Sequence, residues 1–351
     1  MSRAQLTSTV EQNTGGAVSP YVAGKNAVIN GGMDIWQRGT SVSIAASTAY
    51  TSAYNADRWT MPTNANQACT ISRQTTSDTT NLPFIQYCAR IQRNSGQTGT
   101  GQLNWGQPLE TSASIPLSGK TVVVSFYARS GANYSATSNA LGVTLLSGTG
   151  TDQTAWSGYT GSSTVISQTA TLTTTWQRFT YSATVPVTST ELSLYYSFTP
   201  VGTAGANDYY EVTGVQLEFG SVATPFSRAG GTLSGELAAC QRYFQKLSVT
   251  TSQSGELLGF GTAFSSTSVP ITISVPVTMR ILPSLTVSGG ADFRLYDGGS
   301  APATSGMTIY SGNTGQAITI NAASSGLTQY RPYYLIPANL VAAYIQLSAE
   351  L

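Results

Sequence analysis

Two pairs of carboxylates lie close enough in the sequence to suggest acid–base chemistry: Asp208 with Glu211, and Asp292 with Asp297. Two carboxyl groups held roughly 5 to 9.5 Å apart can cleave a glycosidic bond, one as the acid and the other as base or nucleophile. No catalytic motif surrounds either pair, and only 15 residues in the chain are acidic. We therefore expect a protein that is not an enzyme, with glycan cleavage by these carboxylates as an alternative.

The chain contains no histidine and three cysteines, Cys69, Cys88 and Cys240. Without histidine, Ser-His-Asp and Cys-His catalysis are excluded, and so are zinc sites built on imidazole. Three cysteines cannot supply a four-cysteine site, and no loop has the density of Asp and Asn that calcium requires. We expect neither a metal site nor a cofactor.

A different chemistry is suggested by Trp156 and Tyr159, which stand in the loop-like stretch 152–161 without apolar periodicity. An aromatic ring on a loop can serve as a stacking platform for a sugar ring. The alternative is that Trp156 covers the end of a β-sandwich or lies in a contact between subunits.

A second aromatic cluster consists of Tyr330, Tyr333 and Tyr334. Tyrosines bury a large area at a low cost in side-chain entropy, and they therefore suit a binding surface. This cluster predicts either a receptor contact or a seam between subunits. Trp36, Trp59 and Trp176, in contrast, lie inside strongly patterned stretches, and we expect them in the core.

Charge is scarce, and its distribution excludes one class of partner. Only 9% of residues are charged, with 16 basic and 15 acidic residues and a net charge of +1. Nucleic-acid binding needs clustered Lys and Arg, whereas these are scattered singly along the chain, so no nucleic-acid partner is expected. No apolar run reaches 18 residues, so we expect no membrane insertion.

The remaining composition indicates a folded, β-rich protein. Ser and Thr make up 94 of the 351 residues, while hydrophobic residues still account for 40%, which is too high for a disordered chain. The cysteine count is odd and the first residues have no apolar signal-peptide core. We expect synthesis in a reducing cytoplasm, where Cys69 and Cys88 stay unpaired.

The order of patterns along the chain predicts an all-β fold: an antiparallel jelly-roll β-sandwich, one connecting helix and a second, smaller β domain. Residues 1–26 are small and polar and indicate an extended arm, which either docks the chain onto a larger assembly or is a loose terminus. Residues 27–229 contain period-2 strands, best seen at 121–128, 176–185, 191–198 and 210–219. The last of these changes phase at Gly214, which predicts a β-bulge.

Residues 230–248 form the expected connecting helix, with one apolar stripe at helical spacing. Ser234 is the expected N-cap, Glu236 lies in the first turn and Lys246 in the last. The stripe consists of Leu233, Leu237, Cys240, Phe244 and Leu247.

Residues 249–351 return to strand patterns. The alternating run 269–277 carries Pro270 and Pro276 on one parity, which predicts an edge strand or an irregularly paired one. A further strand pattern covers 343–349.

Several stretches resemble a family of phage and prophage virion proteins known as tail fibres or tail spikes. They read NAVINGGMDIWQRGT from Asn26, SGKTVVVSFYARS from Ser118, TTWQRFTYSATVP from Thr174, VQLEFGSVATPF from Val215 and LAACQRYF from Leu237. The resemblance implies a jelly-roll module related to carbohydrate-binding domains, a helix carrying the Cys-Gln-Arg-Tyr signature, a small C-terminal β domain and assembly as a homotrimer.

These observations predict a structural protein of the phage virion, assembled in the host cytoplasm and exposed on the particle surface. Residues 1–26 would attach it to other proteins of the tail or head, and Trp156, Tyr159, Tyr330, Tyr333 and Tyr334 are the candidate contacts to a host-surface glycan or receptor. A capsid fibre or decoration protein without a ligand is one alternative. A glycan depolymerase that uses carboxylates is the other.

Overall fold

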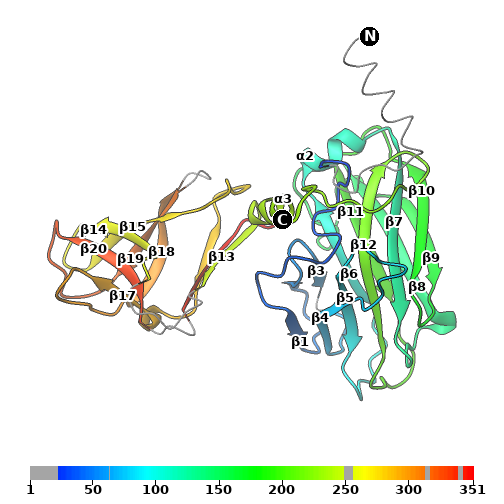
Figure 1. The fold of residues 1–351 in the computed structure, drawn as a ribbon, viewed down its shortest axis with the longest axis horizontal. Coiled ribbons are helices and arrows are strands. Elements are labelled where there is room, and N and C mark those ends of the chain that lie inside the picture. The colour runs from blue at the N-terminus through cyan, green and yellow to red at the C-terminus, as the bar shows by residue number, and fades with distance from the viewer. Residues whose placement is uncertain (1–22, 63, 249–255, 313–316, 339–342) are drawn as a thin grey trace, which may run out of the picture. The chain divides into compact units, whose positions relative to one another are not determined.

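The structure is a computed structural model that describes residues 23–62, 64–248, 256–312, 317–338 and 343–351 (Figure 1). The expected attachment arm, residues 1–26, lies almost wholly outside these ranges. The chain divides into two compact units, residues 1–239 together with Leu351, and residues 240–350. We call them unit 1 and unit 2 and describe each by itself.

Unit 1 is an antiparallel β-sandwich of two six-stranded sheets (Figure 1). Most neighbouring strands in each sheet are not consecutive in the sequence, as in a jelly roll. Sheet A has the order β1 (Ser41–Ile44), β4 (Cys69–Thr75), β5 (Tyr87–Arg93), β12 (Tyr209–Phe219), β7 (Thr121–Ser130) and β10 (Gln177–Thr184). Sheet B has the order β2 (Ser52–Tyr54), β3 (Thr60–Pro62), β6 (Leu103–Leu109), β11 (Glu191–Phe198), β8 (Ala140–Gly148) and β9 (Ser163–Thr171). The predicted fold class is confirmed.

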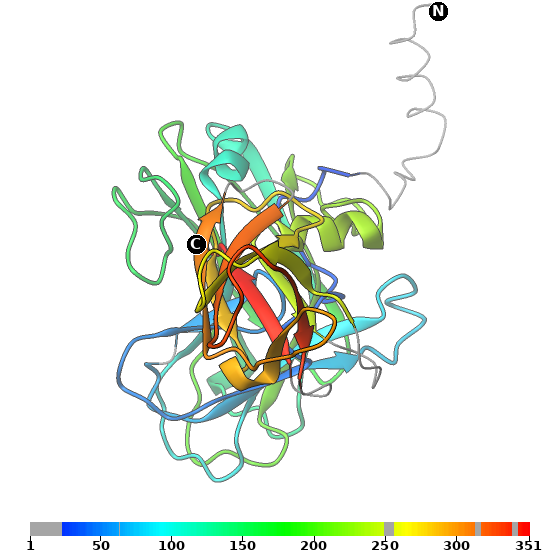
Figure 2. The same ribbon diagram turned by 90° about the vertical axis from the view of Figure 1, so that its left-hand side faces the viewer.

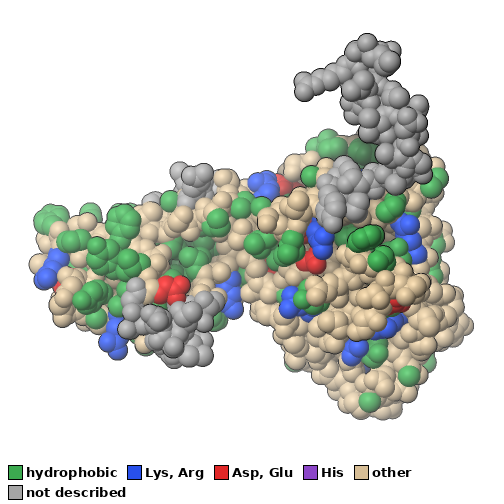
Figure 3. Space-filling view, in the orientation of Figure 1, with side chains coloured by type: hydrophobic (Ala, Val, Ile, Leu, Met, Phe, Trp, Pro, Cys, Tyr) green, Lys and Arg blue, Asp and Glu red, His purple; other side chains and the backbone are tan. Residues whose placement is uncertain are grey.

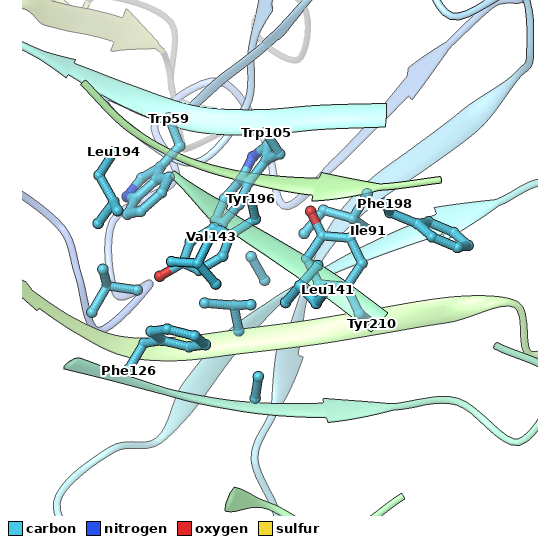
Figure 4. Packing of buried hydrophobic residues seen from close by; sticks show 14 of the residues in the cluster. Trp59, Ile91, Trp105, Phe126, Leu141, Val143, Leu194, Tyr196, Phe198 and Tyr210 are labelled. Carbon is cyan, nitrogen blue, oxygen red and sulfur yellow. The ribbon is translucent and has the colours of Figure 1, made fainter. Parts of the chain in front are cut away.

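The core of unit 1 is built from the alternating apolar positions of these strands (Figure 4). The indole rings of Trp59 and Trp105 stack with centroids 4.2 Å apart, and Tyr196 on β11 lies against Trp105 at 6.2 Å. Tyr196 also meets Phe126 of sheet A edge to face at 4.9 Å, so it joins the two layers. Trp59 is completely buried and Trp36 is 8% exposed, both in this core as expected, whereas the buried Trp176 belongs to a smaller cluster on the outer face of sheet A.

The thiols of Cys69 and Cys88 lie on opposite faces of sheet A and form no disulfide, as expected. Cys69 points into the core of the sandwich, where burial raises the pKa of its thiol to about 12. Cys88 belongs to a small outer cluster with Trp176 and Leu82. Both thiols are therefore protonated packing groups near neutral pH.

The β-bulge predicted at Gly214 is confirmed. The register of β12 against β7 shifts between Thr213 and Gln216, and Gly214 has a φ of +60°. A Cβ at this position would lie 2.7 Å from the side chain of Ile85 and 2.9 Å from that of Tyr127. Both the backbone conformation and the space therefore require glycine.

The connecting helix is shorter than predicted. Helix α3 spans Leu233–Gln241, and residues 244–248 belong to strand β13 (Phe244–Ser248), which pairs with β21 (Tyr344–Ser348). The pairing partner lies a hundred residues away, so a helical spacing read locally could not reveal it. Lys246 consequently lies on a strand, and Leu233 is exposed.

The residue that caps the start of α3 also differs from the expected one. Thr232, and not Ser234, precedes the first helical residue, and its hydroxyl accepts a hydrogen bond from the N–H of Gly235 at 3.1 Å. Glu236 lies in the first turn, as predicted. Its carboxylate accepts hydrogen bonds from the N–H groups of Gly230 and Asn30, and burial raises its pKa.

Unit 2 contains a three-stranded and a six-stranded antiparallel sheet around a second core (Figures 1 and 2). Sheet C has the order β13, β21, β16 (Ser284–Val287). Sheet D has the order β17 (Phe293–Tyr296), β20 (Pro332–Pro337), β14 (Gly259–Thr262), β15 (Ser268–Ser274), β19 (Ala317–Ala323) and β18 (Gly306–Gly312). The expected alternation on β15 and β21 is confirmed by the burial of Ile271, Ile273, Ile345 and Leu347.

Pro270 does not place β15 at an edge, because β14 and β19 flank the strand on either side, and Pro276 lies past its end. Its pairing with β19 is regular over seven residues, from Ser268 to Ser274. Its pairing with β14 is irregular: among the described residues of the two strands, Phe260 and Thr272 are the one pair that lies directly opposite. The missing N–H of Pro270 is thus accommodated on the irregular side, which was the other expected arrangement.

We predict that Gly214→Ala lowers the free energy of unfolding of unit 1 by about 2 to 4 kcal/mol, through backbone strain and collision with Ile85 and Tyr127. Gly202→Ala is the matched control, because Gly202 has a similar φ of +65° and open space around its would-be Cβ. Gly202→Ala should lower the free energy of unfolding by only about 1 kcal/mol. Urea unfolding followed by circular dichroism measures the free energy of unfolding of both variants. Equal decreases in the two variants would contradict the predicted collision with Ile85 and Tyr127.

Candidate functional site

The first carboxylate of the expected pair 208/211 is a structural group. Asp208 and Arg93 are both completely buried, and their side chains lie 2.7 Å apart. Asp208 also accepts hydrogen bonds from the hydroxyl and the N–H of Ser135. Because both groups are buried, Asp208 is not exposed to a substrate. Removing either partner would leave an uncompensated buried charge, so the pair holds the fold together.

The second carboxylate, Glu211, lies in register between two arginines on the outer face of sheet A. Its oxygens accept hydrogen bonds from Arg90 at 2.6 Å and from Arg129 at 2.5 Å. The two guanidinium groups stack on Tyr209 and Trp176 respectively. Glu211 is therefore fully engaged as the centre of a three-charge cluster, and neither it nor Asp208 is placed as an acid or a base.

The other pair, Asp292 and Asp297, is separated by the whole of β17. An extended strand places their backbones roughly 15 Å apart, beyond the range for glycoside hydrolysis. Hydrogen bonds from the N–H groups of Ser300 and Gly299 hold the pKa of Asp297 below its usual range, and Arg331 lies 3.1 Å from it. Among the described residues, no group of three or more acidic or cysteine side chains could hold a metal ion.

The loop that carries Trp156 is tied down by hydrogen bonds at both ends. Thr111 is the first residue of helix α2 (Thr111–Ser114). Its N–H donates a hydrogen bond to Oδ1 of Asp152 at 3.0 Å, and its hydroxyl accepts one from the N–H of Asp152 at 2.8 Å. Gln153 bonds to the N–H and hydroxyl of Thr160. The loop thus presents Trp156 in a fixed position.

Below this loop lies Glu191, the first residue of β11, whose side chain is fully buried. Its carboxylate accepts a hydrogen bond from the Thr111 hydroxyl, so the same threonine joins Glu191 to the loop. Burial raises the pKa of Glu191, and the negative charge of Asp152 adds to this shift.

Trp156 and Tyr195 together form one wall of a hollow of about 250 Å³ on the outer face of sheet B. Their ring centroids lie 5.3 Å apart at an angle of 60°. Tyr195 faces outward because it alternates along β11 with the buried Tyr196. The rest of the lining consists of Tyr50, Pro62, Asn64, Gln102, Asn104, Leu146 and Ala155.

A second hollow, of about 310 Å³, continues along the same face and shares Gln102 with the first. Ser197, two residues along β11 from Tyr195, lines it and donates a hydrogen bond to Asn104 at 2.8 Å. Gln102 donates to the hydroxyl of Thr199 at 3.1 Å. We call the two hollows together the β11 groove. None of the described residues that line it is charged.

Glycines make room for this groove. A Cβ at Gly106, which pairs with Tyr195, would lie 2.4 Å from the Cβ of that tyrosine. A Cβ at Gly142 would lie 3.2 Å from that of Ser197. The neighbouring strands therefore lack side chains where the outward residues of β11 need space.

A larger hollow of about 650 Å³ lies between the stretch 75–86 and the residues Phe226 and Arg228. The guanidinium of Arg228 is engaged by Asp34 at 2.7 Å, and Phe84 at its rim is 71% exposed. This hollow lacks a pair of facing aromatic rings, so its volume alone does not make it the candidate site.

The structure separates the five aromatic residues singled out from the sequence. Trp156 lines the β11 groove, whereas Tyr159 is only 8% exposed and its ring packs near Gly148, so it supports the loop from inside. Burial also raises the pKa of its hydroxyl. Tyr159 has no open ring face on which a sugar could stack, so the expected pairing of Trp156 with Tyr159 is corrected, and Tyr195 is the aromatic residue beside Trp156 in the groove.

The tyrosines of unit 2 divide in the same way. Tyr333 is buried, and its hydroxyl accepts a hydrogen bond from the N–H of Thr328 at 3.0 Å. Tyr330 and Tyr334 are exposed. Tyr195 was not among the contacts expected from the sequence, although the alternation of β11 placed it on the face opposite the apolar one.

Comparisons with known proteins give likenesses of fold at low identity. No protein-family description and no curated protein sequence matches the chain. Solved structures similar to it include a CBM4 module, at 17% identity, covering 54% of this chain and 98% of that one with a TM-score of 0.30. Another is TmCBM61 in complex with β-1,4-galactotriose, at 11% identity, 56% and 99% coverage and a TM-score of 0.32.

A third similar structure is the enzymatically active domain of tailspike protein 4 from bacteriophage CBA120. It is 13% identical, with 57% of this chain and 22% of that one covered and a TM-score of 0.35. With TM-scores this low, the fold rests on the strand order described above. Among the described residues, no helix has the length and apolar character needed to cross a bilayer.

We predict that Glu191→Gln reduces the pH dependence of stability. Because burial raises the pKa of the folded-state carboxyl above its ordinary value of 4.5, the wild type loses stability as the pH rises from about 4.5 through the raised pKa. The amide does not ionise and avoids this loss. Thermal unfolding between pH 4 and pH 8 measures the difference, with the exposed Glu256→Gln as the control. Parallel pH profiles for wild type and Glu191→Gln would refute the prediction.

Proposed function

We propose that the chain recognises a neutral glycan through the β11 groove. The observation that carries this proposal is the pair of rings, Trp156 and Tyr195, facing an uncharged groove lined by amide and hydroxyl groups. Aromatic faces bury the C–H surface of a sugar, while amides can donate to and accept from its hydroxyl groups. An acidic ligand would find no cation in this lining.

We further propose that the protein is a fibre or spike on the surface of a phage particle. The support is the resemblance of its motifs to that family, together with the low charge, which suits subunits that bury surface against copies of themselves. Residues 1–26 would dock onto the tail or head, and the chains would form a homotrimer. Three grooves in one trimer would turn weak individual contacts into strong attachment.

The depolymerase alternative is weakened, because the carboxylates that suggested it are engaged with arginines or lie at opposite ends of a strand. A decoration protein without a ligand is the remaining alternative. The binding experiment that follows distinguishes it from a recognition protein.

We predict that Trp156→Ala and Tyr195→Ala each weaken glycan binding by about tenfold or more, because each removes a ring face from the groove. A glycan array identifies a bound oligosaccharide, and calorimetry with that oligosaccharide measures the loss. Phe84→Ala is the matched control, since it removes an exposed aromatic ring outside the groove. A wild-type protein that binds no glycan on the array would favour the decoration protein.

We predict that native mass spectrometry of the full chain gives three times the 36.7-kDa mass of the monomer. The Trp156→Ala variant should remain a trimer, because the groove serves the ligand and not the assembly. A stable monomer at micromolar concentration would contradict the fibre proposal while leaving the groove untouched.

A further inference from the structure

Strand β14 of unit 2 has an inverted pattern of side-chain size. Along 259–264 the inward positions carry the small residues Gly259, Gly261 and Ala263. The outward positions include Phe260 and, just past the end of the strand, Phe264, each 66% exposed. The hydrophobic effect favours the opposite arrangement, with the aromatic rings inside. The exposure of these rings is therefore a cost that a partner would offset.

The small inward residues are required by the packing of the strands. A Cβ on Gly261 would lie 1.9 Å from the carbonyl oxygen of Pro270, and one on Gly259 would lie 2.5 Å from that of Thr272. Strand β14 thus passes too close to β15 for any inward side chain. This leaves the outer face as the only place where β14 can carry large residues.

Phe260 belongs to a row of aromatic residues across three neighbouring strands. It pairs with Tyr334 on β20, which in turn pairs with Tyr296 on β17. All three are exposed. Because neighbouring strands lie about 4.8 Å apart, the three residues lie next to one another on one rung of sheet D. Figure 3 shows hydrophobic side chains gathered on the surface of this unit.

The same rung continues with hydroxyl groups. Phe260 faces Thr272 on β15, and Thr272 faces Thr319 on β19. Beside the row, Arg331 and Asp297 lie 3.1 Å apart and neutralise each other. The row itself is uncharged and passes from aromatic to hydroxyl side chains, and the exposed Arg294 lies two residues before Tyr296 on the same face of β17.

We propose that this row, Phe260, Tyr334 and Tyr296, is a second glycan-binding surface, for the flat face of an extended neutral polysaccharide. Consecutive rings on one rung match consecutive sugar rings of a ribbon-like chain that runs across the strands, and Thr272 and Thr319 meet its hydroxyl groups. The proposal goes beyond the β11 groove, because it concerns another unit and a planar ligand.

The composition of the row favours a glycan over a second copy of this chain. Interfaces between proteins combine aromatic residues with Met and Arg in a closely packed apolar centre. The row contains only aromatic and hydroxyl side chains. Neutral hydroxyl-rich ligands match such a face in charge and in hydrogen bonding.

The test is depletion of the full-length protein from solution by two insoluble, neutral, flat β-1,4-linked polysaccharides, cellulose and chitin. We expect the wild type to bind at least one of them. The double variant Phe260→Ser/Tyr334→Ser should bind roughly tenfold more weakly or worse, because it removes two of three ring faces. Tyr310→Ser is the matched control, since Tyr310 is 58% exposed on β18 at the far edge of the same sheet.

Three results would overturn the proposal: no depletion of the wild type by either polysaccharide, an equal loss in Tyr310→Ser, or a double variant that binds normally but has a smaller native mass. The last would identify the row as a contact between copies of the chain. Trp156→Ala should retain binding to the insoluble polysaccharide while losing the oligosaccharide of the β11 groove. Failure of one site is thereby distinguishable from failure of the other.

Discussion

The edge-to-face contact between Tyr196 and Phe126 joins the two sheets of unit 1, and the position of the groove depends on it. Tyr196 can reach Phe126 and the stacked Trp59 and Trp105 only when the even-numbered residues of β11 point inward. The odd-numbered residues, Tyr195 among them, then have to face outward. A slip of one residue would exchange the two sets, so one packing contact fixes both the core and the face proposed to bind a ligand.

Scarcity of charge shapes what each surface can do. The few ionised groups of unit 1 are concentrated in contacts such as Arg93–Asp208 and the cluster around Glu211, where they connect strands. These contacts use up the carboxylates that could have served catalysis. The outer face of sheet B is left with amide, hydroxyl and aromatic side chains, which suit a neutral, hydroxyl-rich ligand.

The two proposed glycan surfaces use aromatic rings in different geometries. In the β11 groove, Trp156 comes from a loop and Tyr195 from a strand, and their rings meet at 60°. Thr111 and Glu191 hold that loop, so the shape of the groove depends on buried hydrogen bonds. On sheet D the rings come from successive strands in register, so the pairing of the strands sets the shape of the surface. A groove suits a single glycan chain, whereas a flat row suits a broad one.

The sequence by itself determined the features that depend on neighbours along the chain. Alternation at period 2 identified the strands and their inner faces, and the change of phase at Gly214 located the bulge. Tertiary structure decided the features that depend on distant partners. Residues 244–248 became a strand because they pair with 344–348, and Tyr159 and Tyr333 were buried while Tyr195 and Phe260 were left outside. The physical reason is that strand pairing and burial arise from contacts between residues far apart in the chain, which a local pattern does not contain.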